Sequence, residues 1–251
     1  MDNNLYKYVL RLADSSLILS HRLSEYCSKG PFLEEDLAIS NVSLDLLGQA
    51  ESLLIYAAEM NDDAPDADYL AFRRDEREFL NFQLCELENR DYAYIMARQL
   101  FIDVFNNLLY PELAKSKDER IAGIAAKSVK EVRYHLKRSS DWMKRLGLGT
   151  EESHNRIQEA INDLWVYTGE MFESRDIDKA MAEQGVGVEF NTLHAEWYKQ
   201  VKDILSAGDL ETPPLDSYYA SGSWDGIHTE NLGFLLTDMQ FLPTKYPDAT
   251  W

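Results

Sequence analysis

The feature that most constrains this sequence is a spacing of apolar and small side chains that alternates between four and three residues. Residues spaced in this way lie along one face of an α-helix, where they can pack against a second helix. The first row predicts a helix from Leu5 to Tyr26 that ends before the breaker Lys29-Gly30-Pro31, and the second predicts a helix over residues 33–58. The rows consist of Leu5, Val9, Leu12, Ser16, Leu19, Leu23 and Tyr26, and of Leu33, Leu37, Ser40, Leu44, Leu47, Glu51, Leu54 and Ala58.

Two more long helices follow in the middle of the chain. Residues 91–110 predict a third helix, and Pro111 is expected to begin the next helical piece, because proline is tolerated in the first turn of a helix. Residues 117–146 predict a fourth helix, which ends at Gly147-Leu148-Gly149. Its row consists of Ile121, Ala125, Ser128, Val132, His135, Ser139, Trp142 and Leu146.

The C-terminal part alternates between helices and loop. Thr150 is expected to cap a helix that continues to Phe172, and Asn191 is expected to cap another. Residues 207–228 carry two adjacent prolines and a glycine-rich cluster, which predict a long irregular loop, and a last helix is expected to begin near Thr229.

These elements predict an all-α protein. Seven prolines and 12 glycines in 251 residues leave room for long uninterrupted helices, and no stretch shows the alternation of a strand. We expect residues 1–251 to form a single domain in which four to six long helices pack as a bundle.

Charge and composition limit the possible partners. The formal net charge of −19 makes nucleic acid and anionic membrane surfaces poor partners, because an acidic surface repels phosphate groups. Cys27 and Cys85 are too few for a disulfide framework and suit a reducing compartment. No apolar stretch is long enough to span a bilayer, and the N-terminal residues do not resemble a signal peptide. A cytoplasmic location is therefore expected.

An acidic helical bundle raises the question of a di-iron site. In ferritin-like carboxylate proteins, two helices each supply a Glu and two others each supply a Glu-x-x-His pair, whose members share one helix face. The single Glu-x-x-His of this sequence runs from Glu151 to His154 at the start of a helix, where acids are expected to stabilise the helix N-terminus. Asp225 and His228 have the same spacing but fall in the glycine-rich loop, where a structural role is expected.

Five polar residues within the predicted helices occupy positions at which metal ligands would be expected, namely Asp45, Asp103, Asn106, Glu131 and His135. Asp103 and Asn106 have the spacing of an acid-x-x-His pair with Asn in place of His, and Glu131 and His135 are four residues apart. Because a buried polar group must be paired, a hydrogen-bonded core histidine explains His135 without metal. This ligand set for two irons is incomplete, so we expect no metal, catalytic or cofactor-binding residue in this chain.

One segment has a charge opposite to that of the chain as a whole. Residues 127–145 carry seven of the 25 basic residues, and Glu131 and Asp141 are the only acids among them. A solvated helix face explains this pattern. Alternatively, the segment docks an acidic partner or the phosphates of a coenzyme A ester.

Six stretches in a common order carry a resemblance to a known family. They are LRLADSSLILSHRLSEYC, EEDLAISNVSLDLLGQAESLLIYAAE, LAFRRDEREFLN, AKSVKEVRYHLKRSSDWMKRLGLGTE, INDLWVYTGEMF and HTENLGFLLTDMQFL, from about residue 9 to about residue 242. In them the sequence resembles the C subunits of bacterial ring-1,2-phenylacetyl-CoA epoxidases, which belong to the ferritin-like superfamily.

The resemblance implies a ferritin-like four-helix bundle with additional helices that does not itself perform the oxidation. In that family the catalytic A subunit holds the di-iron centre and the phenylacetyl-CoA, a separate reductase delivers electrons from NADPH, and the C subunit pairs with the A subunit to keep it folded and soluble. A homodimer or a heterotetramer is a further possible assembly.

Three functions therefore stay open. The first is a non-catalytic structural subunit of a multicomponent monooxygenase in aerobic phenylacetate degradation. The second is a self-sufficient di-iron oxygenase subunit that uses Asp45, Asp103, Glu131 and His135. The third is an accessory protein that binds the CoA ester through residues 127–145.

Overall fold

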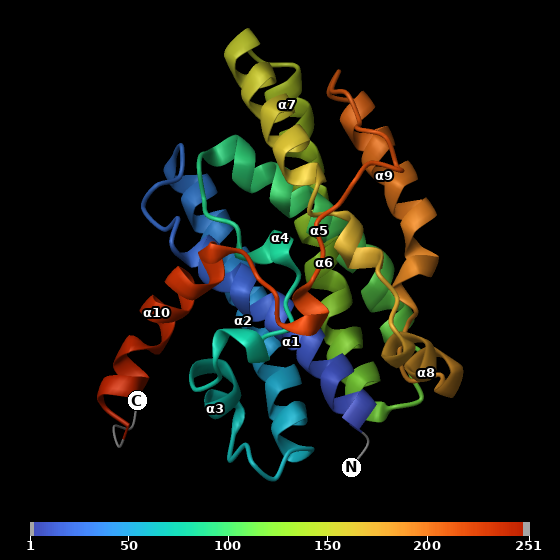
Figure 1. Cartoon of the computed structure of the whole chain (residues 1–251). Helices are drawn as coiled ribbons and strands as arrows, with labels where there is room; N and C mark the ends of the chain where they lie inside the picture. The colour runs from blue at the N-terminus through green and yellow to red at the C-terminus, as the bar shows by residue number, and fades with distance from the viewer. Residues whose placement is uncertain (1–2, 248–251) are drawn as a thin grey trace. The chain divides into compact units, whose positions relative to one another are not determined.

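The computed structural model describes residues 3–247, and this part of the chain consists of helices and connecting loops without a strand (Figure 1). The prediction of an all-α protein is confirmed, and the helical architecture is consistent with the ferritin-like fold. The chain divides into two compact units, one with the residues up to Glu88 and from Gly222 onward, the other with Asn89–Ser221. The single domain over residues 1–251 stays a prediction, and residues 1–2 and 248–251 of it lie outside the described residues.

The first unit is built around a pair of long helices. α1 and α2 pack along each other and are joined by the short connection 25–32. The row of small and apolar residues on α1 packs as predicted, with Val9, Leu19 and Leu23 at most 1 % exposed. The helices of this unit are α1 (Asn3–Ser24), α2 (Leu33–Glu59), α3 (Ala67–Phe72), α4 (Gln83–Glu86) and α10 (Glu230–Lys245).

The row predicted for the packing face of α2 is largely exposed. Leu33, Leu37 and Leu44 are 69 %, 55 % and 63 % exposed. The buried side of α2 is a different row, which consists of Ile39, Val42, Ser43, Leu46, Gln49, Ala50, Leu53, Leu54 and Ala57. The predicted packing face is therefore wrong for the first half of the helix, because apolar residues surround α2 and spacing alone cannot tell which row faces the core.

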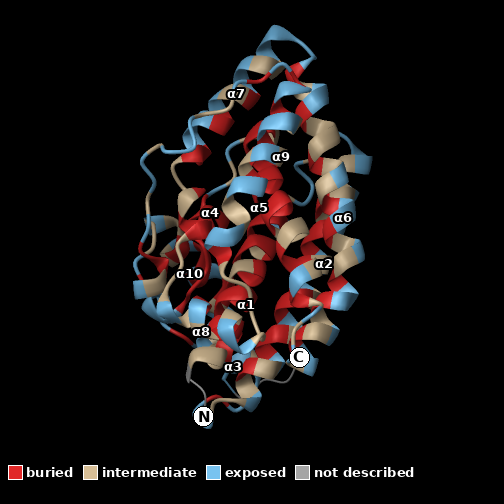
Figure 2. Ribbon diagram, turned by 90° about the vertical axis from the view of Figure 1, so that its right-hand side faces the viewer, coloured by how far each residue is buried: buried red, intermediate tan, exposed pale blue. Residues whose placement is uncertain are grey.

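The second unit is organised around α5. Every residue of this helix from Ala93 to Phe105 is buried, and α5 packs against α6, α7 and α9 (Figure 2). The indole of the fully buried Trp197 fixes α9 by donating a hydrogen bond of 2.9 Å to the carbonyl of Phe101 on α5. The helices of this unit are α5 (Tyr92–Leu113), α6 (Glu119–Gly147), α7 (Glu151–Trp165), α8 (Asp176–Gln184) and α9 (His194–Ser206).

Several helix ends differ from the prediction. Pro111 does not begin a new helix but lies in the last turn of α5, where proline removes one hydrogen bond close to the natural end of the helix. Thr150 caps α7 as predicted, with Oγ1 accepting a hydrogen bond from Ser153 N, but α7 ends at Trp165 and a 3₁₀ turn follows. Asn191 is not a cap, because a 3₁₀ turn over Phe190–Leu193 leads into α9.

Residues 207–228 are irregular as predicted, apart from a 3₁₀ turn over Ser223–Asp225. The unit boundary falls within this loop, between Ser221 and Gly222. The first part is held to the second unit by the Trp165 indole, which donates to the carbonyl of Pro214 at 3.1 Å, and by Ala220 N, which donates to the carbonyl of Val166. The part after Gly222 belongs to the first unit.

Candidate functional site

A buried carboxyl and a buried imidazole lie between α5 and α6. Asp103 and His135 are 3 % and 2 % exposed. Asp103 projects from the most deeply buried helix of the second unit, and His135 belongs to the row of α6 that includes Val132 and Ser139. The predicted row of α6 is thus confirmed at His135, and two of the five candidate ligand positions are in the same buried region.

The surroundings of Asp103 determine its proton affinity. Burial raises the pKa of Asp103 to about 6, while the His135 imidazole, a hydrogen bond from the Ser139 hydroxyl and the Arg138 guanidinium each pull this pKa downward. The Gln99 amide also donates to Asp103 Oδ1, at 3.3 Å. Asp103 is therefore part of a cluster of hydrogen-bonding and cationic groups, as a carboxyl inside a helical bundle requires.

The other three candidate positions are less buried. Asn106 lies one turn after Asp103 on α5, and Glu131 lies one turn before His135 on α6; both are half-buried. Asp45 is also half-buried, on α2 of the first unit. The structure therefore brings together Asp103 and His135 within one buried cluster, whereas Asp45 belongs to the other unit.

The cluster around Asp103 does not fit a di-iron centre. Such a centre needs six side chains, four of them carboxylates, whereas the groups that act on Asp103 are an amide, a hydroxyl, an imidazole and the guanidinium of Arg138. A guanidinium repels metal cations and is not a ligand. Across residues 3–247, no group of three or more His, Cys, Asp or Glu side chains is arranged to hold a metal ion.

The Glu-x-x-His segment stands at the start of α7, where the sequence predicts a role in the helix N-terminus. Glu151 is exposed in the first turn, and the Nδ1 atom of His154 lies 2.8 Å from the carbonyl oxygen of Gly147. This contact ties the first turn of α7 to the end of α6.

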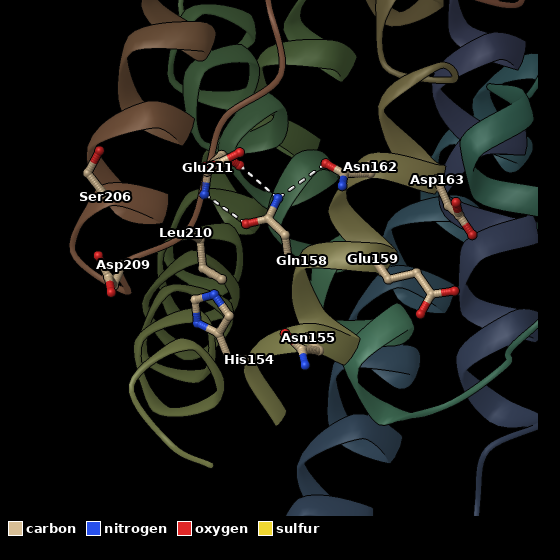
Figure 3. Close-up of a pocket in the computed structure, with 10 residues that line it drawn as sticks. All are labelled: His154, Asn155, Gln158, Glu159, Asn162, Asp163, Ser206, Asp209, Leu210 and Glu211. Atoms are coloured by element: carbon tan, nitrogen blue, oxygen red, sulfur yellow. Dashed lines mark hydrogen bonds between the residues drawn. The ribbon is translucent and has the colours of Figure 1, made fainter. Parts of the chain in front are cut away.

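His154 also lines an open hollow of about 910 Å³ between α7 and the segment that follows α9 (Figure 3). Gln158 spans it, since its amide donates to the carbonyl of Glu211 at 3.1 Å and accepts from Glu211 N at 2.7 Å. Among the described residues that line the hollow there is no Lys or Arg. The lining carboxylates Glu159, Asp163, Asp209 and Glu211 disfavour anionic ligands such as the phosphates of coenzyme A.

Sequence reasoning missed two buried contacts in the first unit, each between an acid and a nitrogen-bearing side chain. In one, the Arg74 guanidinium donates to both carboxylate oxygens of Asp14, with side chains 4 % and 0 % exposed. Leu80 N also donates to Asp14 Oδ2, at 2.9 Å, so the pair fixes the segment between α3 and α4 against α1. No motif in the sequence signals this pairing, because the partners are 60 positions apart.

In the second pair, His228 contacts Glu86, and both side chains are fully buried. The Nδ1 atom of His228 is 2.8 Å from Glu86 Oε2, and Nε2 is 2.8 Å from the carbonyl oxygen of Phe79. Because a carbonyl only accepts, Nε2 donates, and the contact at Nδ1 joins the imidazole to the carboxyl through one proton. His228 of the Asp225-x-x-His228 segment thus makes structural contacts, as expected, with Glu86 and Phe79.

The basic segment of α6 points largely to solvent. Lys127, Lys130, Arg133, Lys137, Lys144 and Arg145 are exposed. Lys137 pairs with Asp141 at 2.8 Å, and the Arg145 guanidinium lies over the Trp142 ring. These contacts fit a solvated helix face.

In the part of the chain that the structure describes, no helix combines the length and apolar character needed to cross a membrane.

The fold and the site together define an all-helical protein, consistent with the ferritin-like class, in which a buried acid and a buried imidazole lie between two helices, and among the described residues no group of three or more metal-ligating side chains accompanies them. Comparison with known proteins identifies the family of this chain. The chain belongs to the family described as phenylacetic acid catabolic protein, whose model matches residues 1–251. It is 45 % identical over 249 residues to the C subunit of the 1,2-phenylacetyl-CoA epoxidase of Escherichia coli (strain K12), a match that covers 99 % of this chain and 100 % of the relative. The resemblance noted in the sequence is therefore confirmed.

Proposed function

We propose that this chain is a non-catalytic structural subunit of a multicomponent, NADPH-dependent ring-1,2-phenylacetyl-CoA epoxidase, and that it acts in the cytoplasm in aerobic phenylacetate degradation. Its partner is the catalytic A subunit of the same complex, which holds the di-iron centre and the substrate. This chain contributes no metal ligand and does not oxidise the substrate by itself.

The observation that carries the proposal is the cluster around Asp103. A working di-iron subunit needs carboxylates and imidazoles that converge from four helices. Here the acid is instead surrounded by Gln99, Ser139, His135 and Arg138, which satisfy it without metal. The similarity over nearly the whole chain to the C subunit of an epoxidase supports the assignment to this complex.

Iron content and complex formation test the proposal together. The chain is expressed with iron-supplemented medium, both alone and with the A subunit, and iron is measured by elemental mass spectrometry. We expect iron near zero in the chain alone, a helical circular dichroism spectrum, and an iron-containing complex when both proteins are present. About two irons per chain, lost on substitution of Glu131 or His135 but not of the comparison residue His154, would instead indicate a self-sufficient oxygenase.

The exposed basic residues of α6 favour a second candidate function, namely binding of the CoA ester. Calorimetric titration of the chain with coenzyme A separates the two possibilities. A heat signal that disappears in the double variant Lys130→Glu/Arg133→Glu would support CoA binding, whereas a titration of the native chain without a heat signal would exclude it.

A further inference from the structure

One row of α2 exposes apolar side chains and is interrupted by the exposed acid Glu51. Its members are Leu33, Leu37, Leu44, Leu47 and Ile55, which are 69 %, 55 %, 63 %, 39 % and 43 % exposed. With a rise of about 1.5 Å per residue, the row extends over about 33 Å of the helix. Single exposed apolar residues are common on proteins, but a row along one helix marks an interaction site. We call this row the α2 seam.

The spacing of the α2 seam indicates what kind of surface covers it. From Leu33 to Leu47 the positions advance by four, three, four and three residues, with Ser40 as the small member. A row with this period remains in contact with a neighbouring helix that crosses at about 20°, because side chains of one helix enter the gaps of the other. The opposite side of α2 already packs against α1, so α2 has a second face suited to a helix.

The negative charge of α2 indicates which kind of helix can pack against the seam. The helix carries six acids and no Lys or Arg. Those acids are Glu34, Glu35, Asp36, Asp45, Glu51 and Glu59. Pairing of α2 with α2 from a second copy of this chain would bring two acidic helices together, with Glu51 of each within the seam, and like charges at an interface oppose association. A partner helix with Lys or Arg beside its apolar row complements both properties.

We propose that the α2 seam docks a helix of the catalytic A subunit that carries apolar side chains at the same alternating spacing, flanked by basic residues. This inference rests on the proposed function, and it assigns the pairing surface to one helix of this chain. Leu37 and Leu44 are the central contacts, and Glu51, which is exposed and in register with them, faces the basic flank of the partner helix.

The test measures the dissociation constant between the purified chain and the purified A subunit by calorimetry. The seam variant is Leu37→Ser/Leu44→Ser, and the control is Leu148→Ser, which removes a side chain of the same type that is 65 % exposed at the end of α6. Far-UV circular dichroism and the thermal midpoint establish that each variant is folded. Because the substituted side chains are exposed, both variants are expected to fold.

We expect the seam variant to raise the dissociation constant about a hundredfold, as loss of central interface residues does, and the control to change it less than about twofold. A charge variant, Glu51→Lys, is expected to raise it about fivefold at low salt, with a smaller effect as salt screens the interaction.

Other results would overturn the inference. Equal affinities of the seam variant and the native chain would place the pairing surface elsewhere, while the proposed function would stand. If the seam variant instead converts a dimer of this chain to a monomer and leaves A-subunit binding unchanged, a second copy covers the seam. If the native chain does not bind the A subunit, the inference fails together with the proposed function.

Discussion

At the scale of single residues, the buried carboxyl of Asp103 couples stability to pH. Its pKa in the folded protein is about 6, above the ordinary value of 3.8, so the folded state holds the proton more tightly than the unfolded state. The stability contributed by the protonated form is present at low pH and is lost as the pH rises through about 6.

Asp103→Asn removes this titration. We expect the variant to be more stable than the native protein by about 1–3 kcal/mol above pH 7, with the difference shrinking toward pH 4, because a shift of one pKa unit corresponds to about 1.4 kcal/mol. Urea unfolding between pH 4.5 and 8 measures the effect. If the variant is less stable at every pH, the hydrogen bonds to the carboxylate outweigh the cost of its burial.

The Glu86–His228 pair allows a second residue-level prediction. His228→Ala leaves the fully buried Glu86 without its imidazole partner, which should lower the free energy of unfolding by about 3–5 kcal/mol. Lys137→Ala breaks an exposed pair on α6, and there we expect a change below about 1 kcal/mol. Urea unfolding followed by circular dichroism compares the two variants, and equal losses would contradict the structural role given to His228.

At the scale of elements, the turn after Gly222 depends on a glycine. Gly226 has a φ of +66°, and a Cβ there would lie 2.2 Å from the carbonyl oxygen of Arg77. Gly226→Ala should therefore destabilise the protein by about 2 kcal/mol or more, through both backbone strain and displacement of the Arg77 segment.

Gly123 provides the matched control within a helix. A Cβ at this position of α6 has no heavy atom within 4 Å, so Gly123→Ala should raise the free energy of unfolding by about 0.5–1 kcal/mol through better helix propensity. Thermal unfolding of both variants gives the comparison. If Gly226→Ala does not lower the free energy of unfolding relative to Gly123→Ala, the turn after Gly222 tolerates a side chain.

The helices also show where spacing identifies a packing face. On α6, charged residues surround one apolar row, so the row predicted from Ile121 to Ser139 is the buried one. On α2, two apolar rows coexist, and the predicted row from Leu33 to Leu47 is the exposed one. The periodicity of apolar residues therefore located both helices. It identified the buried face only for α6, because the other faces of that helix are mainly polar.

At the scale of the whole molecule, the segment from Gly222 to Lys245 belongs to the same unit as α1–α4. Arg11 on α1 connects this segment to the rest of the first unit. Its guanidinium donates to the carbonyl of Leu80 and to the Ser223 hydroxyl, and it lies between the rings of Phe82 and Trp224 at 4.5 and 4.1 Å from their centroids. Arg22 adds a hydrogen bond of 2.7 Å to the carbonyl of Asn231.

Hydrogen exchange should show that α10 unfolds together with the other helices of the first unit. In native-state exchange at low denaturant, we expect α10 to lose protection together with α1 and α4, because residues that share a core open together. Gly226→Ala should accelerate exchange in these helices and leave α5, α6 and α7 close to the native rates. If α10 instead opens alone, its packing is independent of the first unit.

The sequence by itself determined the helical class, the positions of α1, α2, α5 and α6, the loop 207–228 and the absence of a second Glu-x-x-His. These properties depend on residues close together in the chain, whose spacing and turn chemistry act locally. It also singled out Asp103 and His135, but only among five polar helix positions, and it did not distinguish these two buried residues from the half-buried Asp45, Asn106 and Glu131.

Only the tertiary structure decided what surrounds those positions. The Arg138 guanidinium and the Gln99 amide beside Asp103, the contacts of Asp14 with Arg74 and of Glu86 with His228, and the exposed seam on α2 all depend on which helix faces which. Their partners lie up to 142 positions apart, and no local pattern specifies a contact over that distance. Residues 222–245 belong to a different unit from the loop that precedes them for the same reason. Their hydrogen bonds to Arg11 and Arg22 join residues that are far apart in the sequence.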